Sequence, residues 1–242
     1  SNSATISFDG IESVWLNAGS GSDSVAVLGT GLSTPVTLNM GAGNDRVDLG
    51  TTGVSMLGIL STVSVNGEAG TDVLNLNDQS GSGPFYVVSD NSVQRNFTSF
   101  NYGTVESLNL NTGDGLDFVT VHSTLATTSV TIKTGAGDDR VSVGNSVASL
   151  DDIRGTVTVD GQGGLDRLVL NDLGEDAYHE YVVTANRVTR DGAAAINYAN
   201  QEFLEIYAGG PIVLESVPAA VAENTFFVKS TSVATRLETP DF

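Results

Sequence analysis

Apolar and polar residues alternate along short stretches of this chain, and glycine-rich segments separate many of these stretches. In residues 36–39 (VTLN) and 46–49 (RVDL) every second residue is apolar, and residues 41–44 (GAGN) lie between them. Alternation with a period of two gives a strand one apolar face, and no stretch carries a convincing helical period. The pattern therefore predicts short β-strands with one buried face each, joined by glycine turns.

The turns recur as Gly-x-Gly-x-Asp motifs in two sets of three. Their aspartates are, in chain order, Asp23, Asp45, Asp72, Asp117, Asp139 and Asp166. Each aspartate of the second set lies 94 residues after its counterpart in the first (117 − 23 = 94). Between the motifs, residues 86–96 (YVVSDNSVQRN) parallel residues 181–191 (YVVTANRVTRD), and Glu12 precedes Glu106 by the same 94 residues. We infer that one ancestral unit was duplicated.

The duplication predicts a single elongated domain over residues 3–242. Residues 11–104 and 105–200 are equivalent units, and residues 201–242 are either a partial third unit of a longer array or a degenerate cap. We interpret residues 1–2 as a cloning remnant. A natural leader is then expected to lie outside this sequence.

The third unit is expected to begin near the C-terminus. Residues 224–231 (NTFFVKST) resemble residues 117–124 (DFVTVHST), but they lack the preceding glycines and replace the aspartate. Residues 210–221, which are rich in proline and alanine, look like an insertion between the units.

The spacing of the motifs predicts an all-β fold, a right-handed parallel β-solenoid with coils of about 22–27 residues. Successive motif aspartates lie 22 and 27 residues apart within each set, and the gap of 45 residues between Asp72 and Asp117 is close to two such intervals. Identical turns that recur once per coil are what stacked coils about 4.8 Å apart require. The alternative is an antiparallel β-sandwich, in which similar strand lengths and turn spacings occur.

The composition excludes several kinds of partner. Asp and Glu outnumber Lys and Arg by 29 to 10, which gives a net charge of −19 and makes nucleic acid a poor partner. No apolar run approaches the roughly 20 residues that cross a bilayer, so we expect no membrane insertion. The chain has no cysteine, so disulfides cannot stabilise it.

The Gly-x-Gly-x-Asp turns carry the chemistry expected of a calcium site. Glycines let backbone carbonyls point to a shared centre, and the aspartate adds carboxylate oxygens, which are the ligands that Ca²⁺ prefers. The expected metal ligands are Asp23, Asp45, Asp72, Asp117, Asp138, Asp139 and Asp166. The alternative is that each aspartate accepts hydrogen bonds from backbone N–H groups of its own turn, while Arg46, Arg140 and Arg167 offset the charge across coils.

Residues 41–49 (GAGNDRVDL) and 135–143 (GAGDDRVSV) resemble the calcium-binding nonapeptide of the RTX (repeats-in-toxin) proteins, with Val47 and Val141 at its aliphatic position. The resemblance covers only the six turns. Motifs of that family follow one another every nine residues, whereas here one motif occurs per coil. The resemblance implies calcium as the cofactor and a large secreted or cell-surface bacterial protein.

We predict no catalytic residues, because the acids that stand out recur with the repeat whereas catalytic residues normally occur once. His122 occupies a surface position, and His179 lies in an acidic loop, where a lone histidine is more often solvated than catalytic. Residues 175–180, and Asp151 and Asp152 with Arg154, are the non-repeated clusters that could frame a sugar site.

The expected function is that of a non-catalytic structural or adhesive segment of an extracellular repeat protein. Such a segment extends or presents other domains or contacts surface glycans, and further repeats are expected to flank it. The alternative is a carbohydrate-active β-helix, either a polysaccharide lyase or a glycosidase, because both occur on parallel β-helices. Fold alone does not confer that activity.

Overall fold

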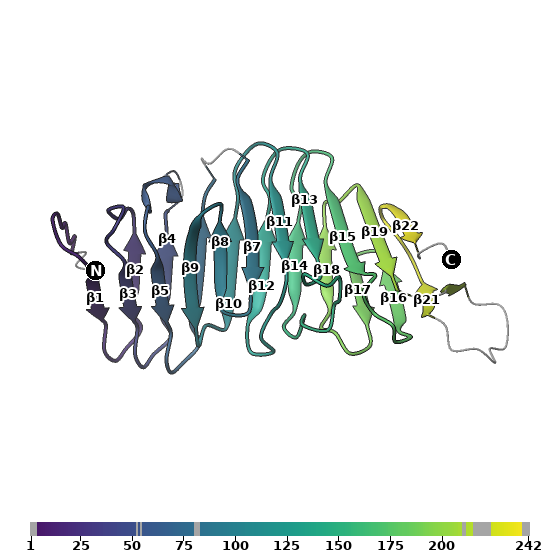
Figure 1. The fold of residues 1–242 in the computed structure, drawn as a ribbon, viewed down its shortest axis with the longest axis horizontal. Helices are drawn as coiled ribbons and strands as arrows, with labels where there is room; N and C mark the ends of the chain where they lie inside the picture. Colours follow the sequence, from purple (N-terminus) through teal and green to yellow (C-terminus); the bar gives the residue numbers. More distant parts are fainter. Residues whose placement is uncertain are drawn as a thin grey trace.

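The computed structural model describes residues 4–51, 53, 55–79, 83–209, 212–214 and 224–238, and within them the chain is all-β (Figure 1). Residues 1–2 and most of the expected insertion at 210–221 lie outside the described residues. The strands form two sheets of eleven, named here sheets A and B. A single 3-10 turn, Met56–Gly58, is the one helical element among the described residues.

The bounds of the strands follow the order in which they pair. Sheet A contains β1 (Val14–Asn17), β3 (Val36–Asn39), β5 (Val63–Asn66), β9 (Thr98–Gly103), β8 (Ser92–Arg95), β7 (Phe85–Ser89), β11 (Phe118–Val121), β13 (Arg140–Val143), β15 (Arg167–Asp172), β19 (Phe203–Ala208) and β22 (Ala234–Glu238). Sheet B contains β2 (Ser24–Val27), β4 (Arg46–Leu49), β6 (Val73–Asn77), β10 (Ser107–Asn111), β12 (Ser129–Lys133), β14 (Val157–Asp160), β18 (Ile196–Ala199), β17 (Arg187–Arg190), β16 (Glu180–Thr184), β21 (Asn224–Val228) and β20 (Ile212–Leu214).

Consecutive strands mostly alternate between the two sheets, and outside the segments β7–β9 and β16–β18 each pairs in parallel with the next strand of its own sheet. The stretch of chain from one such strand to the next is called a winding here. Val14 lies opposite Val36, and Val36 lies opposite Val63, which are the two intervals that the motif spacing predicts (36 − 14 = 22 and 63 − 36 = 27). All but four of the pairings between described strands are parallel. The antiparallel β-sandwich is therefore excluded for this part of the chain.

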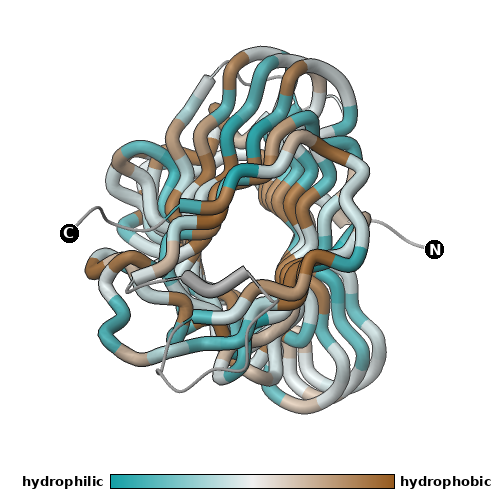
Figure 2. Tube along the Cα trace, turned by 90° about the vertical axis from the view of Figure 1, so that its right-hand side faces the viewer, coloured by the Kyte–Doolittle hydropathy of each residue, from teal (hydrophilic) through white to brown (hydrophobic). Residues whose placement is uncertain are grey.

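The alternating pattern of the sequence buries one face of each strand between the sheets. Leu74 on β6 lies opposite Leu108 on β10, and Leu76 lies opposite Leu110; all four are fully buried. Along the molecule's length, hydrophobic segments of successive strands lie behind one another around the centre (Figure 2). One continuous core therefore runs through both repeat units.

Stacked asparagines line the outer faces of the strands. The side-chain amide of Asn66 donates to Asn39 Oδ1 at 2.8 Å, and Asn39 donates to Asn17 Oδ1 at the same distance. On sheet B, Asn109 donates to Asn75 in the same way at 2.9 Å. Such ladders form only when identical side chains repeat in register along parallel strands.

A three-stranded antiparallel meander interrupts the winding in each unit. Strands β7, β8 and β9 all lie in sheet A, and their counterparts β16, β17 and β18 all lie in sheet B. The predicted coil length is wrong here, because Val73 pairs with Ser107 and Val63 pairs with Phe100, which are longer intervals (107 − 73 = 34 and 100 − 63 = 37). The interval from Asp72 to Asp117 is therefore not two coils, since antiparallel strands fill part of it.

The meander makes the repeat unit nine strands long, from β1 to β9, and the next unit begins at β10. Because nine is odd and three of the nine stay in one sheet, β1 lies in sheet A whereas its counterpart β10 lies in sheet B. Equivalent residues of the two units therefore lie on opposite sheets.

A buried ionic triad fixes each meander. The hydroxyl of Tyr86 and Nε of Arg95 donate to Asp78 Oδ2 at 2.6 and 2.5 Å, and Ser55 donates to Asp78 Oδ1 at 2.6 Å. Burial, followed by the charge of Asp78, raises the pKa of Tyr86, so its hydroxyl stays protonated and donates. The equivalent residues of the second unit are Asp172, Tyr181 and Arg190.

Replacing Arg190 by methionine should destabilise the fold by about 3 to 5 kcal/mol, because Asp172 would remain as a buried and unpaired charge. The matched control is Arg187→Met on the same strand, which is exposed and should change the free energy of unfolding little. Urea denaturation followed by circular dichroism measures both. Equal stabilities of the two variants would show that the triad does not hold the meander.

Candidate functional site

The motif aspartates of the first unit form a ladder of hydrogen bonds between windings, at the start of the strands of sheet B. The backbone amide of Asp23 donates to Asp45 Oδ1 at 2.7 Å, and the amide of Asp45 donates to Asp72 Oδ1 at 2.8 Å. The ladder ends at Glu106, whose Oε2 accepts from the amide of Asp72 at 2.7 Å. Each carboxylate thus satisfies an amide one winding earlier, rather than an amide of its own turn as the alternative interpretation had it.

The second unit repeats this ladder in sheet A. The amide of Asp117 donates to Asp139 Oδ1 at 2.8 Å, that of Asp139 to Asp166 Oδ1 at 3.0 Å, and that of Asp166 to Glu202 Oε2 at 2.7 Å. The six aspartates therefore lie in two separate ladders, one on each sheet. Sequence reasoning missed both glutamates, although the equal offset that relates Glu12 to Glu106 was a visible signal.

Asp138 lies outside the ladder, on the exposed side of the turn. Its Oδ1 accepts from the amide of Leu165 at 2.9 Å, and the equivalent Asn44 accepts from the amide of Thr71 at 3.0 Å. An asparagine performs the same role at this position, so a negative charge is not required there.

The second oxygen of each ladder aspartate is buried without a hydrogen-bond partner. At two positions it faces a glycine: a Cβ added to Gly67 would lie 2.5 Å from Asp72 Oδ2, and one added to Gly161 would approach Asp166 Oδ2 as closely. An added Cβ would come closer still to a backbone carbonyl oxygen, 2.1 Å from that of Thr104 or Asn200, so the neighbouring backbone and the carboxylate together require glycine at these positions. At these positions a glycine Cα fills the space beside the carboxylate.

These donor atoms do not fit a calcium shell as they stand. Calcium takes six to eight oxygens, whereas Asp45, Asp72, Asp139 and Asp166 each give one oxygen to an amide and keep the other buried. In the part of the chain that the structure describes, the ladders contain no three carboxylate oxygens grouped closely enough to share an ion. The calcium hypothesis stays a prediction, and the geometry favours hydrogen bonding.

The arginines that follow the motif aspartates do not offset the ladder charges as expected. Arg46 pairs with Asp48 at 2.7 Å, Arg167 pairs with Glu205, and Nε of Arg140 contacts Ser142 Oγ at 3.4 Å. The reason is the alternation of the strands, which points these side chains outward while the ladder carboxylates stay inside.

Burial raises the pKa of four of the ladder aspartates. The pKa of Asp117 and that of Asp166 each rise to about 6, and those of Asp72 and Asp139 rise as well, chiefly because burial penalises the charged form. Asp117 differs from the others in its contacts, because neither of its buried oxygens has a well-formed hydrogen bond. Its strand pairs with β7, which places it opposite Pro84, a residue without an amide hydrogen.

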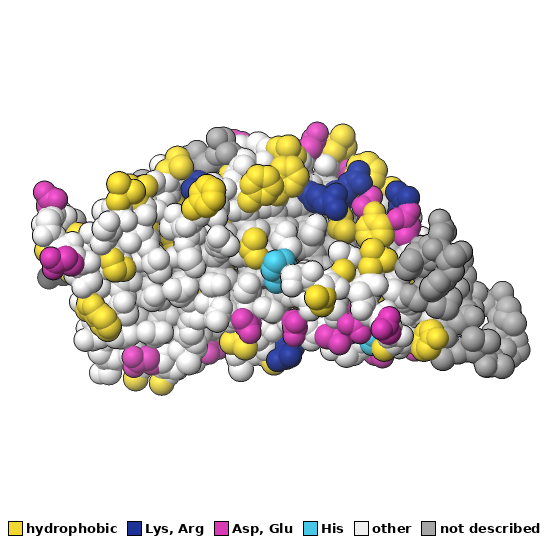
Figure 3. Space-filling view, in the orientation of Figure 1, with side chains coloured by type: hydrophobic (Ala, Val, Ile, Leu, Met, Phe, Trp, Pro, Cys, Tyr) yellow, Lys and Arg dark blue, Asp and Glu magenta, His cyan; other side chains and the backbone are white. Residues whose placement is uncertain are grey.

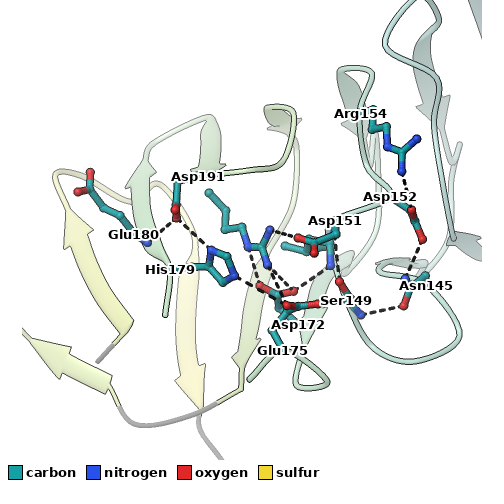
Figure 4. Close-up of polar contacts among 12 residues, drawn as sticks. Asn145, Ser149, Asp151, Asp152, Arg154, Asp172, Glu175, His179, Glu180 and Asp191 are labelled. Atoms are coloured by element: carbon teal, nitrogen blue, oxygen red, sulfur yellow. Dashed lines mark hydrogen bonds and ion pairs between the residues drawn. The ribbon is translucent and has the colours of Figure 1, made fainter. Parts of the chain in front are cut away.

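A second polar cluster is not repeated in the first unit (Figure 4). One ligand atom each of Asp151, Glu175 and His179 lies within 4.8 Å of the others, and no other group of three or more acids and histidines in the described residues comes as close. His179 lies between two carboxylates, with Nδ1 3.3 Å from Asp191 Oδ1 and Nε2 4.0 Å from Glu175 Oε2. Its side chain is only 12% exposed, so the expectation of a solvated histidine is wrong.

Arg190 lies among these acids and partly neutralises them. Its Nη1 is 2.5 Å from Asp151 Oδ1, and its Nη2 is 4.0 Å from Glu175 Oε2. The structure thus brings the 175–180 loop and Asp151 together, as a sugar site would need. The neighbouring Asp152 is not part of the cluster, because it pairs with Arg154 and accepts from Asn145.

No protein-family model matches this chain, and no curated protein or solved structure matches it either. Among the described residues, no helix has the length and apolarity needed to cross a membrane. A functional interpretation therefore rests on the residues of the chain itself.

Asp117→Asn should stabilise the protein at neutral pH and weaken its pH dependence. An Asp with a folded pKa of about 6 favours the folded state at low pH, and this stability is lost as the pH rises through that pKa. The wild type should therefore melt at a higher temperature near pH 5 than above pH 7. The variant should gain about 1 to 2 kcal/mol at neutral pH, because no buried charge remains.

The control is Asp114→Asn, an exposed acid of the same turn, which removes one charge from the surface only. Calorimetric melting at both pH values compares the variants. A lower melting temperature for Asp117→Asn at neutral pH would show that the ionised carboxylate is needed.

Millimolar calcium should leave the melting temperature unchanged relative to EGTA-treated protein, because the ladder oxygens are already occupied or enclosed. A calcium-dependent rise in melting temperature that disappears in both Asp45→Asn and Asp139→Asn would contradict this and place the ion at the ladders. A rise that survives in these variants would place the ion elsewhere.

Proposed function

We propose that this chain is a segment of a secreted or cell-surface bacterial repeat protein, and that it acts as a stiff, non-catalytic spacer that extends or presents other domains. In this proposal the two mostly parallel sheets are the walls of a right-handed parallel β-solenoid. Its units stack end to end, and no metal is needed to hold them.

The observation that carries the proposal is the junction between the units. Asp72 of the first unit donates its amide to Glu106 of the second, and Asp166 donates to Glu202, which begins the third. These bonds repeat, with one extra methylene, the aspartate bonds inside each unit. The junction therefore has the same construction as the interior, and a flexible linker is absent between the two described units.

The shared core supports the same conclusion. Strand β6 of the first unit pairs in parallel with β10 of the second, and Leu74 and Leu108 pack across the junction. In repeat proteins whose neighbours share an interface of this kind, bending one unit against the next costs packing energy. Separate domains on a linker carry no such cost.

The acids of the chain support a structural role over catalysis. Asp45, Asp117 and Asp139 are between 0 and 3% exposed, so a substrate cannot reach them. In the non-repeated cluster, Arg190 pairs with Asp151 at 2.5 Å and lies 4.0 Å from Glu175 Oε2, so both acids face a fixed cation. A carbohydrate-active enzyme would require at least one carboxyl free to exchange a proton with the substrate.

The proposal extends to flanking repeats. Glu12 matches Glu106 and Glu202 in the repeat and is exposed. It would accept the same amide bond from the last motif aspartate of a preceding unit. Units of this kind can be added in series without any new type of contact.

Small-angle X-ray scattering of the whole chain should give the profile of a rod, and an added copy of residues 105–200 should lengthen the rod without changing its cross-section. Two separated maxima in the distance distribution of the longer chain would contradict the stiff junction.

Glu106→Ala should lower the free energy of unfolding by about 1 to 3 kcal/mol, because the amide of Asp72 loses its acceptor. Glu106→Gln keeps an acceptor and serves as the control.

A further inference from the structure

One row of outward-facing residues on sheet A differs from the rest of the surface. The first residues of five neighbouring strands lie opposite one another in register, and hydrophobic and basic side chains gather over these strands in Figure 3. This aromatic–arginine row consists of Phe85, Phe118, Arg140, Arg167 and Phe203. Neighbouring members stand one strand spacing, about 4.8 Å, apart.

Of the aromatic members Phe85 is exposed, whereas Phe118 and Phe203 are half-buried. Phe85 is 61% exposed, and its ring stacks on that of Phe118 with centroids 5.1 Å apart and planes 18° apart. At the other end of the row, the guanidinium of Arg167 lies 5.1 Å from the centre of the Phe203 ring. The stacking holds the rings in a fixed orientation, which lowers the entropic cost of placing a flat ligand against them.

The row also concentrates positive charge on an acidic protein. The chain carries ten Lys and Arg residues against 29 acids, yet Arg140 and Arg167 are adjacent here and Arg236 lies two strands further on. Arg140 is exposed and makes no ion pair with a described residue; its one contact is with Ser142. Arg167 and Arg236 line a shallow pocket of about 290 Å³ together with Phe203 and Glu205.

The duplicated unit provides an internal comparison. The matching positions on sheet B are Ser24, Arg46, Val73 and Ser107, in the same register, and the counterpart of Phe85 is Glu180 on β16. None of them is aromatic. Their one arginine pairs with Asp48, whereas sheet A carries two adjacent arginines, of which Arg167 pairs with Glu205 and Arg140 makes no ion pair with a described residue. Because the same backbone accepts serine and valine at these positions, folding does not require the aromatic rings of sheet A.

We propose that the aromatic–arginine row binds an acidic polysaccharide of uronic-acid type. The C–H faces of sugar rings would lie on Phe85, Phe118 and Phe203, since the negative face of an aromatic ring attracts weakly positive C–H groups. A sugar carboxylate would pair with Arg140, whose planar guanidinium group matches a carboxylate in two hydrogen bonds, while the neighbouring Arg167 pairs with Glu205 and adds positive charge beside it. The site rests on the proposed function, because it gives the extracellular spacer a ligand.

Net charge does not distinguish the glycan from nucleic acid. A nucleic acid carries a phosphate at every nucleotide and polygalacturonate a carboxylate at every sugar, so a chain with a net charge of −19 repels both. The groups of the row itself, its arginines and neighbouring hydroxyls, therefore decide which polymer binds. The row is narrow and bordered by Thr120 and Ser142, whose hydroxyls suit sugar hydroxyls.

The test is the binding of polygalacturonate to the full chain, with dextran as the neutral probe and single-stranded DNA as the competing polyanion. We expect polygalacturonate to bind, and we expect its binding to weaken as salt is added. Phe118→Ser, which copies the serine at position 24, and Arg140→Ala should each weaken binding about tenfold. Arg46→Ala, the matched arginine on sheet B, should bind like the wild type, and melting curves should confirm that all variants fold.

The proposal is overturned if polygalacturonate does not bind, if Arg46→Ala weakens binding as much as Arg140→Ala, or if dextran or the DNA binds equally well. Such a result leaves the spacer intact, because scattering tests its stiffness independently. Conversely, suppose that scattering shows a flexible chain while Arg140→Ala still weakens polygalacturonate binding. That result would contradict the spacer function and support the binding site at the aromatic–arginine row.

Discussion

The fold depends on the bond from a backbone amide to a carboxylate one winding later. Every turn of a parallel stack leaves amides that cannot pair within their own turn, and a buried amide without an acceptor is costly. The ladder aspartates supply that acceptor, as Asp45 does for Asp23 and Asp139 for Asp117. Because the donor and acceptor belong to different windings, each bond also fixes the register of the strands that follow.

Where the bond between an amide and a ladder carboxylate cannot form, the residues at that position differ. Asp117 lies opposite Pro84 and receives no amide from the preceding winding, and burial raises the pKa of its carboxyl. In the next unit the corresponding residues are His179 and Asn224, and the amide of His179 donates to Asn224 Oδ1 at 2.7 Å. The side-chain N–H of Asn224 also donates to the carbonyl oxygen of Gly209. Asparagine thus meets the geometric requirement of the ladder without a buried charge.

The regular parts of this fold could be predicted from the sequence, and the irregular parts could not. Alternation and the regular spacing of the motif aspartates identify the strands and their parallel pairing, because both follow from one buried face per strand. The meander could not be predicted from the sequence, because the interval from Asp72 to Asp117 matches two coils in length. Length alone cannot distinguish a hairpin from a winding. The sequence also did not predict the role of the glutamates at positions 106 and 202 or the cluster around His179. Their partners lie far away in the sequence or in separate loops.

The odd number of strands in each unit determines how a series of such units would behave. Each meander adds two extra strands to one sheet. If the extra strands always lay in the same sheet, that sheet would become longer than the other, and the series of units would bend into an arc. Here the first meander widens sheet A and the second widens sheet B, so that both walls reach eleven strands. Equivalent strands of the two units lie in opposite sheets, so the extra strands of one unit offset those of the next. A long series would thus run straight, and any given face would recur only at every second unit.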